Sequence, residues 1–297
     1  MVKGLLASVA ASVMFAAMYY MAPFLAPLDG EQIFGWRVLC TLPFTTVLLL
    51  ALRQGGRVRM LALRVRRQPS LALALLASSA MLGLQLWLFL WAPLHGRALP
   101  VSLGYFLLPL VMVLAGRLLF RERLSRLQWT AAALAGAGVL HELVRAGGMS
   151  WETWVVALGY TVYFVMRRRL ATDHLGGHWL DMLLLAPAAL WFVARPPSSL
   201  PLLAQHSHLW SMVPVLGVVS AVALALYMAA SRWLPLALFG LLSYVEPVLL
   251  ALVALLLGES IAPAQWPTYG PIFAAVAVLV LDGVLRLYAG QTRPAAT

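Results

Sequence analysis

The stretch LSYVEPVLL, residues 242–250, places a carboxylate and a proline inside a run that is otherwise apolar over 234–257. A solvated loop would explain Glu246 and Pro247, but nothing else in the run is typical of a loop. About 20 apolar residues are enough for a helix to cross the hydrocarbon core of a bilayer. The stretch therefore predicts a membrane helix that carries an acidic residue near its middle.

The whole chain resembles this stretch in composition, because 63% of it is hydrophobic and only 10% is charged. A soluble domain carries about 25% charged residues, so this chain has too few to coat a globule. We predict an all-α polytopic membrane protein with no soluble domain. Its ten expected transmembrane helices lie at 4–25, 31–52, 71–92, 99–120, 127–145, 151–168, 178–195, 209–231, 234–257 and 265–288.

The basic residues test this topology. If the N-terminus is cytoplasmic, 17 of the 21 basic residues fall in or beside breaks on the cytoplasmic side, and 3 fall on the other side (Arg97, Arg145 and Arg195). Such a bias is the positive-inside rule of membrane proteins. It predicts a multi-pass protein of the bacterial inner membrane with the N-terminus and the C-terminus both in the cytoplasm.

An internal repeat divides the chain. Each copy has a proline in one span, a glutamate in the following turn and a Gln-Trp pair before the next span: Pro109, Glu122 and Gln128-Trp129 in the first copy, Pro247, Glu259 and Gln265-Trp266 in the second. Five spans per copy is an odd number, so the second copy enters the membrane in the opposite sense. Inverted repeats are typical of secondary transporters, with the substrate site at the midplane between halves. We expect the halves to be 1–146 and 147–297.

The same region resembles a known family. The residues that carry the resemblance are SLGYFLLPL at 102–110, Arg121-Glu122-Arg123, Gln128-Trp129, Trp91 and Trp36-Arg37. They are similar to RarD-type proteins of the EamA family in the drug/metabolite transporter superfamily. The resemblance implies ten helices in two inverted halves, a central cavity, and export or exchange of small metabolites. The family has Asn where this chain has Gln85 and often Gly where it has Glu246, which leaves the charge preference for substrate open.

Glu246 is the strongest site candidate, because an ionisable residue inside a span usually faces a cavity or a partner. Protonation, ion pairing or water would each lower its cost in the membrane. We expect it to carry a coupling proton or to neutralise a cationic or zwitterionic substrate; the alternative is a hydrogen-bonded brace between helices. Pro247 and Pro109 are expected to open or kink their helices, since proline cannot donate to the helical ladder.

Further candidates follow from helical spacing. Ser243 shares a face with Glu246, and Tyr105 shares one with Pro109, because residues three or four apart are neighbours on a helix. The other expected substrate-binding residues are Gln85, Trp87, Trp91 and Arg37. The alternatives are an interfacial aromatic belt for the tryptophans and an outward-reaching side chain for Arg37. Asp181 and Asp282 are expected near helix ends in contact with water.

These features predict a secondary active transporter that works by alternating access and is coupled to protons through Glu246. An uncoupled facilitator or scramblase is the first alternative, and a membrane-bound enzyme or an assembly factor is the second. No enzyme motif occurs, and no cofactor or metal is expected; His206 and His208 are weak evidence for a metal site. The expected partners are a small-molecule substrate and membrane lipid, not nucleic acid, with the protein as a monomer or homodimer.

Overall fold

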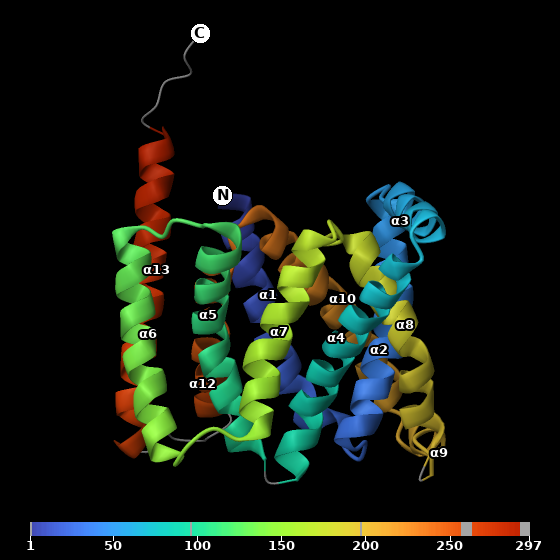
Figure 1. Ribbon diagram of the computed structural model, residues 1–297. Coiled ribbons are helices and arrows are strands. Elements are labelled where there is room, and N and C mark those ends of the chain that lie inside the picture. Colours follow the sequence, from blue (N-terminus) through green and yellow to red (C-terminus); the bar gives the residue numbers. More distant parts are fainter. Residues whose placement is uncertain (1, 96, 197, 257–262, 292–297) are drawn as a thin grey trace.

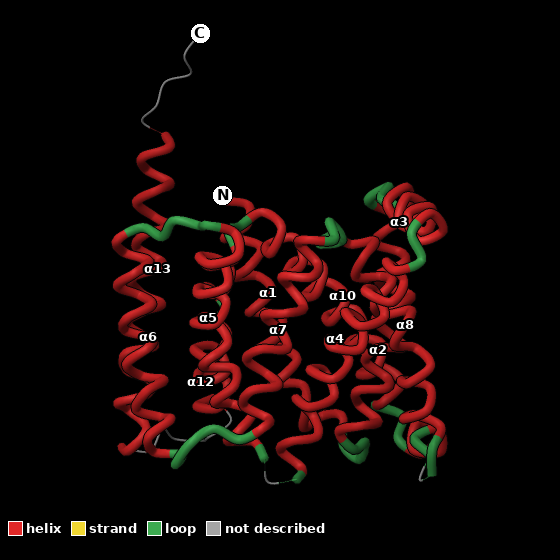
Figure 2. Tube along the Cα trace, viewed as in Figure 1, coloured by secondary structure: helices red, strands yellow, loops and turns green. Residues whose placement is uncertain are grey.

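The computed structural model describes residues 2–95, 97–196, 198–256 and 263–291, and within these ranges the chain is helical without any β-strand (Figure 2). Two 3-10 helices, η1 and η2, precede α2 and α13. The elements are α1 (Val2–Met21), η1 (Ala22–Leu25), α2 (Gly30–Ala51), α3 (Gly55–Arg67), α4 (Ser70–Leu94), α5 (Ala98–Phe120), α6 (Arg126–Arg145), α7 (Trp151–Arg169), α8 (Leu175–Ala194), α9 (Leu200–Gln205), α10 (Leu209–Trp233), α11 (Leu236–Leu242), α12 (Val245–Leu256), η2 (Pro263–Gln265) and α13 (Trp266–Gln291).

The apolar runs of the sequence become the long helices of the bundle. Within the described residues, six segments are long and apolar enough to cross a membrane, and they lie in α2, α4, α5, α8, α10 and α13. The helices α1 and α11–α12 hold shorter apolar segments, at Val2–Met18 and Leu236–Leu249. The protein is therefore an all-helical membrane protein.

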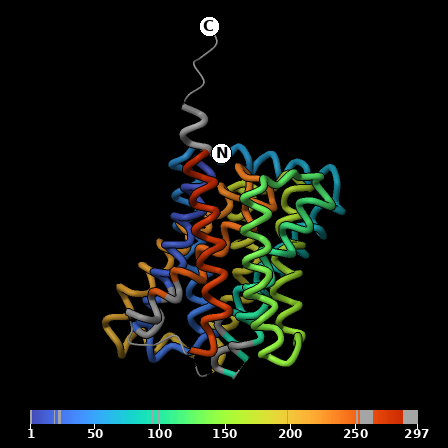
Figure 3. The backbone as a smooth tube through the Cα atoms, turned by 90° about the vertical axis from the view of Figure 1, so that its left-hand side faces the viewer, coloured from blue at the N-terminus to red at the C-terminus, as the bar shows by residue number. Residues whose placement is uncertain are grey.

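The long helices stand side by side, and α1 begins on the same side of the molecule on which α13 ends (Figure 1). Helices that are far apart in the sequence pack together, above all α1 with α10, α2 with α8, α5 with α7 and α6 with α13. The last pair forms the left edge of the bundle in Figure 1 and faces the viewer in Figure 3. The main apolar core includes Phe34, Tyr163, Phe239 and Tyr244, each almost fully buried.

The run that was expected to form the ninth helix, with a kink or an opened turn at Pro247, is divided. The helix α11 ends at Leu242 and α12 begins at Val245, so Ser243 and Tyr244 form a turn between two half-helices. Pro247 has no N–H to donate to the carbonyl oxygen of Ser243. That carbonyl accepts instead from the N–H of Glu246 at 3.2 Å, in a tighter three-residue turn. The division agrees with the expectation that Pro247 opens or kinks its helix, and the missing proline donor contributes to it.

The Gln-Trp pairs mark two helix starts. At the first, Ser125 and Gln128 form a capping box, in which each side chain bonds the backbone N–H of the other residue at 3.1 Å. The amide nitrogen of Gln128 also donates to Asp282 of α13 at 3.0 Å. At the second, Gln265 and Trp266 lie where η2 gives way to α13. Glu259 lies outside the described residues.

Candidate functional site

Glu246 enters the bundle directly after the turn that separates α11 from α12. Its side chain is partly exposed, although most residues around it are apolar. Within the described chain, its carboxylate accepts no hydrogen bond and forms no ion pair within 4.0 Å. The guanidinium of Arg37, on α2, attracts it across the site. The arrangement leaves a carboxylate available to a ligand or a proton.

Arg37 does not reach out to the surface, as the alternative for this residue would require. Its residue exposure is 7%, and its Nε donates to the hydroxyl of Ser220 on α10 at 3.1 Å. The two terminal nitrogens of its guanidinium have no partner among the described residues. The terminal nitrogens of the Arg37 guanidinium therefore form a cationic fork near Glu246. Such a fork can bind a carboxylate or a phosphate through two hydrogen bonds.

Three tyrosines surround this pair of charges. Tyr105 and Tyr160, on α5 and α7, lie against one another with ring centroids 6.0 Å apart. Tyr227 of α10 lies 3.3 Å from the hydroxyl oxygen of Ser243. All three phenol groups lie near enough to Glu246 for its charge to act on them. Their faces offer a surface on which a flat or cationic ligand can stack.

The three candidates on α4 lie apart from these charges or are already engaged. Gln85 is 1% exposed and its amide nitrogen donates to the carbonyl of Val155 on α7 at 2.7 Å, so it ties two helices together. Trp87 and Trp91 stack on one another with ring centroids 5.1 Å apart. Trp91 stacks in turn on His95, beside the turn between α4 and α5. The tryptophans therefore form an aromatic column that leads toward one end of the bundle.

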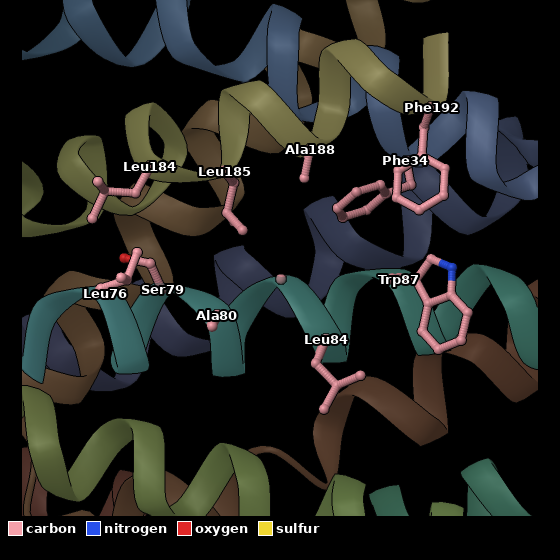
Figure 4. A pocket seen from close by; sticks show the side chains of 11 residues that line it. Phe34, Leu76, Ser79, Ala80, Leu84, Trp87, Leu184, Leu185, Ala188 and Phe192 are labelled. Carbon is pink, nitrogen blue, oxygen red and sulfur yellow. The ribbon is translucent and has the colours of Figure 1, made fainter. Parts of the chain in front are cut away.

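Trp87 also lines an open groove between α4 and α8 with a volume of about 350 Å³ (Figure 4). The groove is almost entirely apolar, and neither Glu246 nor Arg37 belongs to it. Its lining residues are Phe34, Leu76, Ser79, Ala80, Gly83, Leu84, Trp87, Leu184, Leu185, Ala188 and Phe192. Apolar walls without charged groups are suited to hydrocarbon chains, so we place the polar site at Glu246.

A second buried polar cluster corrects the expectation for Asp181. Asp181 is 0% exposed instead of reaching water. It accepts hydrogen bonds from Ser79 at 2.7 Å and Tyr163 at 2.9 Å, and Arg167 lies 3.4 Å away. Asp282 is likewise buried, at 6% exposure. Both carboxylates are held by partners on other helices, and no pattern along their own helices indicates such partners.

Two residues of the site were missed by sequence reasoning, Ser220 and Tyr227. They are seven residues apart on α10 and therefore share one face. Polar residues at that interval in an apolar span are the signal that could have found them. The structure also brings Tyr160 of α7 against Tyr105.

The residues considered for a metal site are His206 and His208. His206 and His208 have ring centroids 5.8 Å apart in the loop around the start of α10. Across the part of the chain that the structure describes, no group of three or more His, Cys, Asp or Glu side chains is arranged to hold a metal ion.

Comparison with known proteins places the chain. No family model matches it. It is 44% identical to the chloramphenicol-sensitive protein RarD of Pseudomonas aeruginosa, over 98% of this chain and 97% of that protein. It is 40% identical to an uncharacterized transporter of Pasteurella multocida, over 97% and 98% of the two chains. A crystal structure that is 20% identical superposes with a TM-score of 0.69 and covers 94% of this chain and 98% of that one, so the two share a fold.

The helical bundle and these relatives define the class: the protein is a membrane transporter. Its relatives carry the names of transporters and not of enzymes. Within that class, the chain belongs to the RarD-type family, which agrees with the resemblance of residues 102–129.

Proposed function

We propose that this protein is a secondary active transporter that exports or exchanges small metabolites or drugs across the bacterial inner membrane. In the proposed topology it crosses the membrane ten times, with both ends in the cytoplasm. Transport proceeds by alternating access, in which two inverted halves, 1–146 and 147–297, rock about a central site. The observation that carries the proposal is the unpaired carboxylate of Glu246 at a helix break, opposite the free fork of Arg37.

The packing of the helices supports two related halves. Suppose that the helices of the two halves correspond in chain order: α1, α2, α4, α5 and α6 with α7, α8, α10, α11–α12 and α13. If the halves are related, each contact between two helices should have a counterpart, which is the contact between the two corresponding helices. The contact of α5 with α7 corresponds to that of α1 with α12, and the contact of α4 with α7 to that of α1 with α10. The pairs α2–α8, α6–α13 and α5–α11 correspond to themselves. All of these contacts occur.

Ion pairs between the halves lie where alternating access needs contacts that can separate. Arg97 pairs with Glu152 and Glu31 with Arg195 at one end of the bundle. At the other end, Glu122 pairs with Arg168 at 2.9 Å. The carboxylate of Glu122 also accepts from the backbone N–H groups of Leu236 and Ala237 at 2.7 and 2.8 Å, at the start of α11. If α11 moves, Glu122 must therefore either move with it or lose these hydrogen bonds.

The charges of the site favour a substrate with both an acidic and a basic group. The fork of Arg37 binds a carboxylate or phosphate, and Glu246 neutralises an ammonium group between the faces of Tyr105, Tyr160 and Tyr227. When the site is empty, a proton on Glu246 removes the cost of an isolated carboxylate in the membrane. Substrate and proton would then compete for one carboxylate, which is a simple basis for exchange.

Two steps test the proposal. A thermal-shift screen of the purified protein against metabolites and drugs first identifies a substrate. Transport of that substrate into proteoliposomes is then driven by a pH gradient, with wild type and Glu246→Gln compared. We expect the gradient to accelerate wild-type transport and to have no effect on the variant. An unchanged response to the gradient in Glu246→Gln would rule out proton coupling through this residue.

The uncoupled alternative makes a different prediction in the same vesicles. A facilitator or scramblase would move substrate down its own gradient at the same rate with or without a pH gradient. Failure of any labelled substrate to exchange in counterflow would instead favour the enzyme or the assembly factor.

A further inference from the structure

The short helix α3 has a sequence unlike that of the helices around it. Its 13 residues, GGRVRMLALRVRR, include five arginines and no acidic residue. Leu61 is 4% exposed and packs with Leu71 and Leu75 of α4. The helix thus rests on the ends of α4 and α8 and lies on the side of the bundle where α1 begins (Figure 1).

The face of α3 that points away from the bundle combines charge with apolar surface. Met60 and Leu63 are 60% and 45% exposed and share that face. Arg59, Arg66 and Arg67 are also exposed, and none of them forms an ion pair or a hydrogen bond within the described chain. A helix with exposed apolar side chains between free arginines has the pattern of a segment that lies in the interface of a bilayer.

The surroundings of α3 add positive charge instead of compensating it. Arg57 lies close enough to Arg232 for the two to repel one another, and Asp173 is the nearby acidic group that offsets this repulsion. Burial, and then the charge of Arg57, lowers the pKa of His174 to about 4, so this histidine stays neutral among the arginines. An anion that lies among these arginines would lower their mutual repulsion.

We propose that α3 binds the headgroups of anionic phospholipids in the adjoining leaflet. Arg59, Arg66 and Arg67 contact the phosphates, while Met60 and Leu63 enter the boundary between headgroups and acyl chains. The membrane helices hold α3 at the level of the leaflet, so the lipid headgroups already lie beside it. Anionic lipid attracts such juxtamembrane arginines strongly, and the attraction falls as salt screens it.

The test measures which lipid stays on the protein. Full-length protein is reconstituted into vesicles of phosphatidylcholine and phosphatidylglycerol in equal amounts, and the bound lipids are identified by native mass spectrometry after gentle extraction. We expect wild type to retain phosphatidylglycerol preferentially. Arg59→Gln/Arg67→Gln should lose this preference by about fivefold for each arginine removed.

A matched variant separates α3 from general charge. Arg123→Gln/Arg126→Gln removes the same charge from exposed arginines elsewhere and should keep the preference. An equal loss in both variants, or no loss in the first, overturns the proposal. Displacement of the retained lipid by glycerol 3-phosphate at equal concentration would also overturn it, because the arginines would then bind a free anion and not a lipid in the leaflet.

A second readout tests the apolar contacts. Leu63→Cys is labelled with an environment-sensitive dye in a Cys40→Ser background, since Cys40 is the lone cysteine of the chain. A blue shift on moving from detergent to vesicles containing phosphatidylglycerol supports insertion. An emission that stays typical of water contradicts it.

Discussion

Two membrane segments that contain a proline at the corresponding repeat position, α5 and α11–α12, differ in whether the helix is continuous. Pro109 lies inside a helix that continues from Ala98 to Phe120. Pro247 follows a turn at Ser243 and Tyr244 that divides its run into two half-helices. Proline alone therefore does not break a membrane helix here.

The residues before each proline account for the difference. At the break, the hydroxyl of Ser243 donates to the carbonyl of Phe239 at 3.2 Å, and that of Tyr244 donates to the carbonyl of Phe106 at 2.7 Å. Serine side chains that bond the backbone compete with the helical ladder. In α5 the residues at the same distances before the proline are Tyr105 and Phe106, and within the described residues neither side chain bonds the backbone of its own helix. The comparison teaches that α5 stays continuous across its proline, while the division of α11–α12 places the carboxylate of Glu246 in the first turn of α12.

The largest expected effect besides that of Glu246 comes from Arg37, whose guanidinium attracts Glu246 of the divided helix. Arg37→Gln removes the cationic fork, and a hydrogen bond to a charged group contributes about 1.5–3 kcal/mol. We expect the KM for an acidic or zwitterionic substrate to rise about 10- to 100-fold. Ser220→Ala, which removes only the partner of Nε, should change the KM much less. Equal effects of the two variants would mean that Arg37 is structural.

The next prediction concerns the contact that holds the start of α11. Glu122→Gln removes the ion pair with Arg168 and weakens the cap on Leu236 and Ala237. Because these bonds are charge-assisted and partly buried, we expect the variant to be less stable by about 1–3 kcal/mol. Thermal unfolding in detergent measures this, with Arg123→Gln as the control at an exposed neighbour. An unaltered midpoint would show that α11 is held by packing alone.

The prolines themselves give a matched pair of variants. Pro247→Ala restores a backbone donor, so α11 and α12 can join and transport should slow several-fold. Pro109→Ala restores a donor in a helix that is already continuous, and we expect little change in rate. Substrate flux in proteoliposomes checks both. If Pro109→Ala slows transport as much as Pro247→Ala does, the break has no special role.

The smallest effect is expected for the bond that joins the two proline helices. Tyr244→Phe leaves the buried carbonyl of Phe106 without the hydroxyl that it accepts from, at a cost of about 1 kcal/mol. The unfolding midpoint should fall by a few degrees. Tyr20, which is 44% exposed, supplies the control Tyr20→Phe. A midpoint equal to that of wild type would mean that water or relaxation replaces the bond.

Much of the fold was predictable from the sequence, because apolar runs and the placement of arginines act along the chain. Helices of the described residues overlap the predicted runs, with 234–257 divided in two, and six of their segments are long and apolar enough to cross a membrane. That ten helices cross the membrane stays a prediction. The helix α3 was not predicted, because a cytoplasmic break between two spans also explains its arginines. Its apolar residues, spaced at helical intervals, carry that information but are few.

The candidate site was predictable only where one helix determines it. Glu246, Ser243 and Tyr105 could be singled out from their own spans. The burial of Asp181 could not, because its partners Ser79 and Arg167 come from other helices. Trp87 and Trp91 were candidates for the site, but they stack on each other, and Trp91 stacks on His95 at the end of α4. The burial and contacts of these residues depend on how the helices pack together, which a single sequence does not reveal.

The central claim is that Glu246 binds the coupling proton and that this function belongs to the broken helix. It is tested most directly by measuring proton movement and substrate movement in the same proteoliposomes, with an entrapped pH dye and a labelled substrate. In wild type, we predict that protons move in a fixed ratio to substrate. In Glu246→Gln, substrate counterflow should continue while the coupled proton movement disappears. Proton movement that continues in the variant at the wild-type ratio would contradict the account.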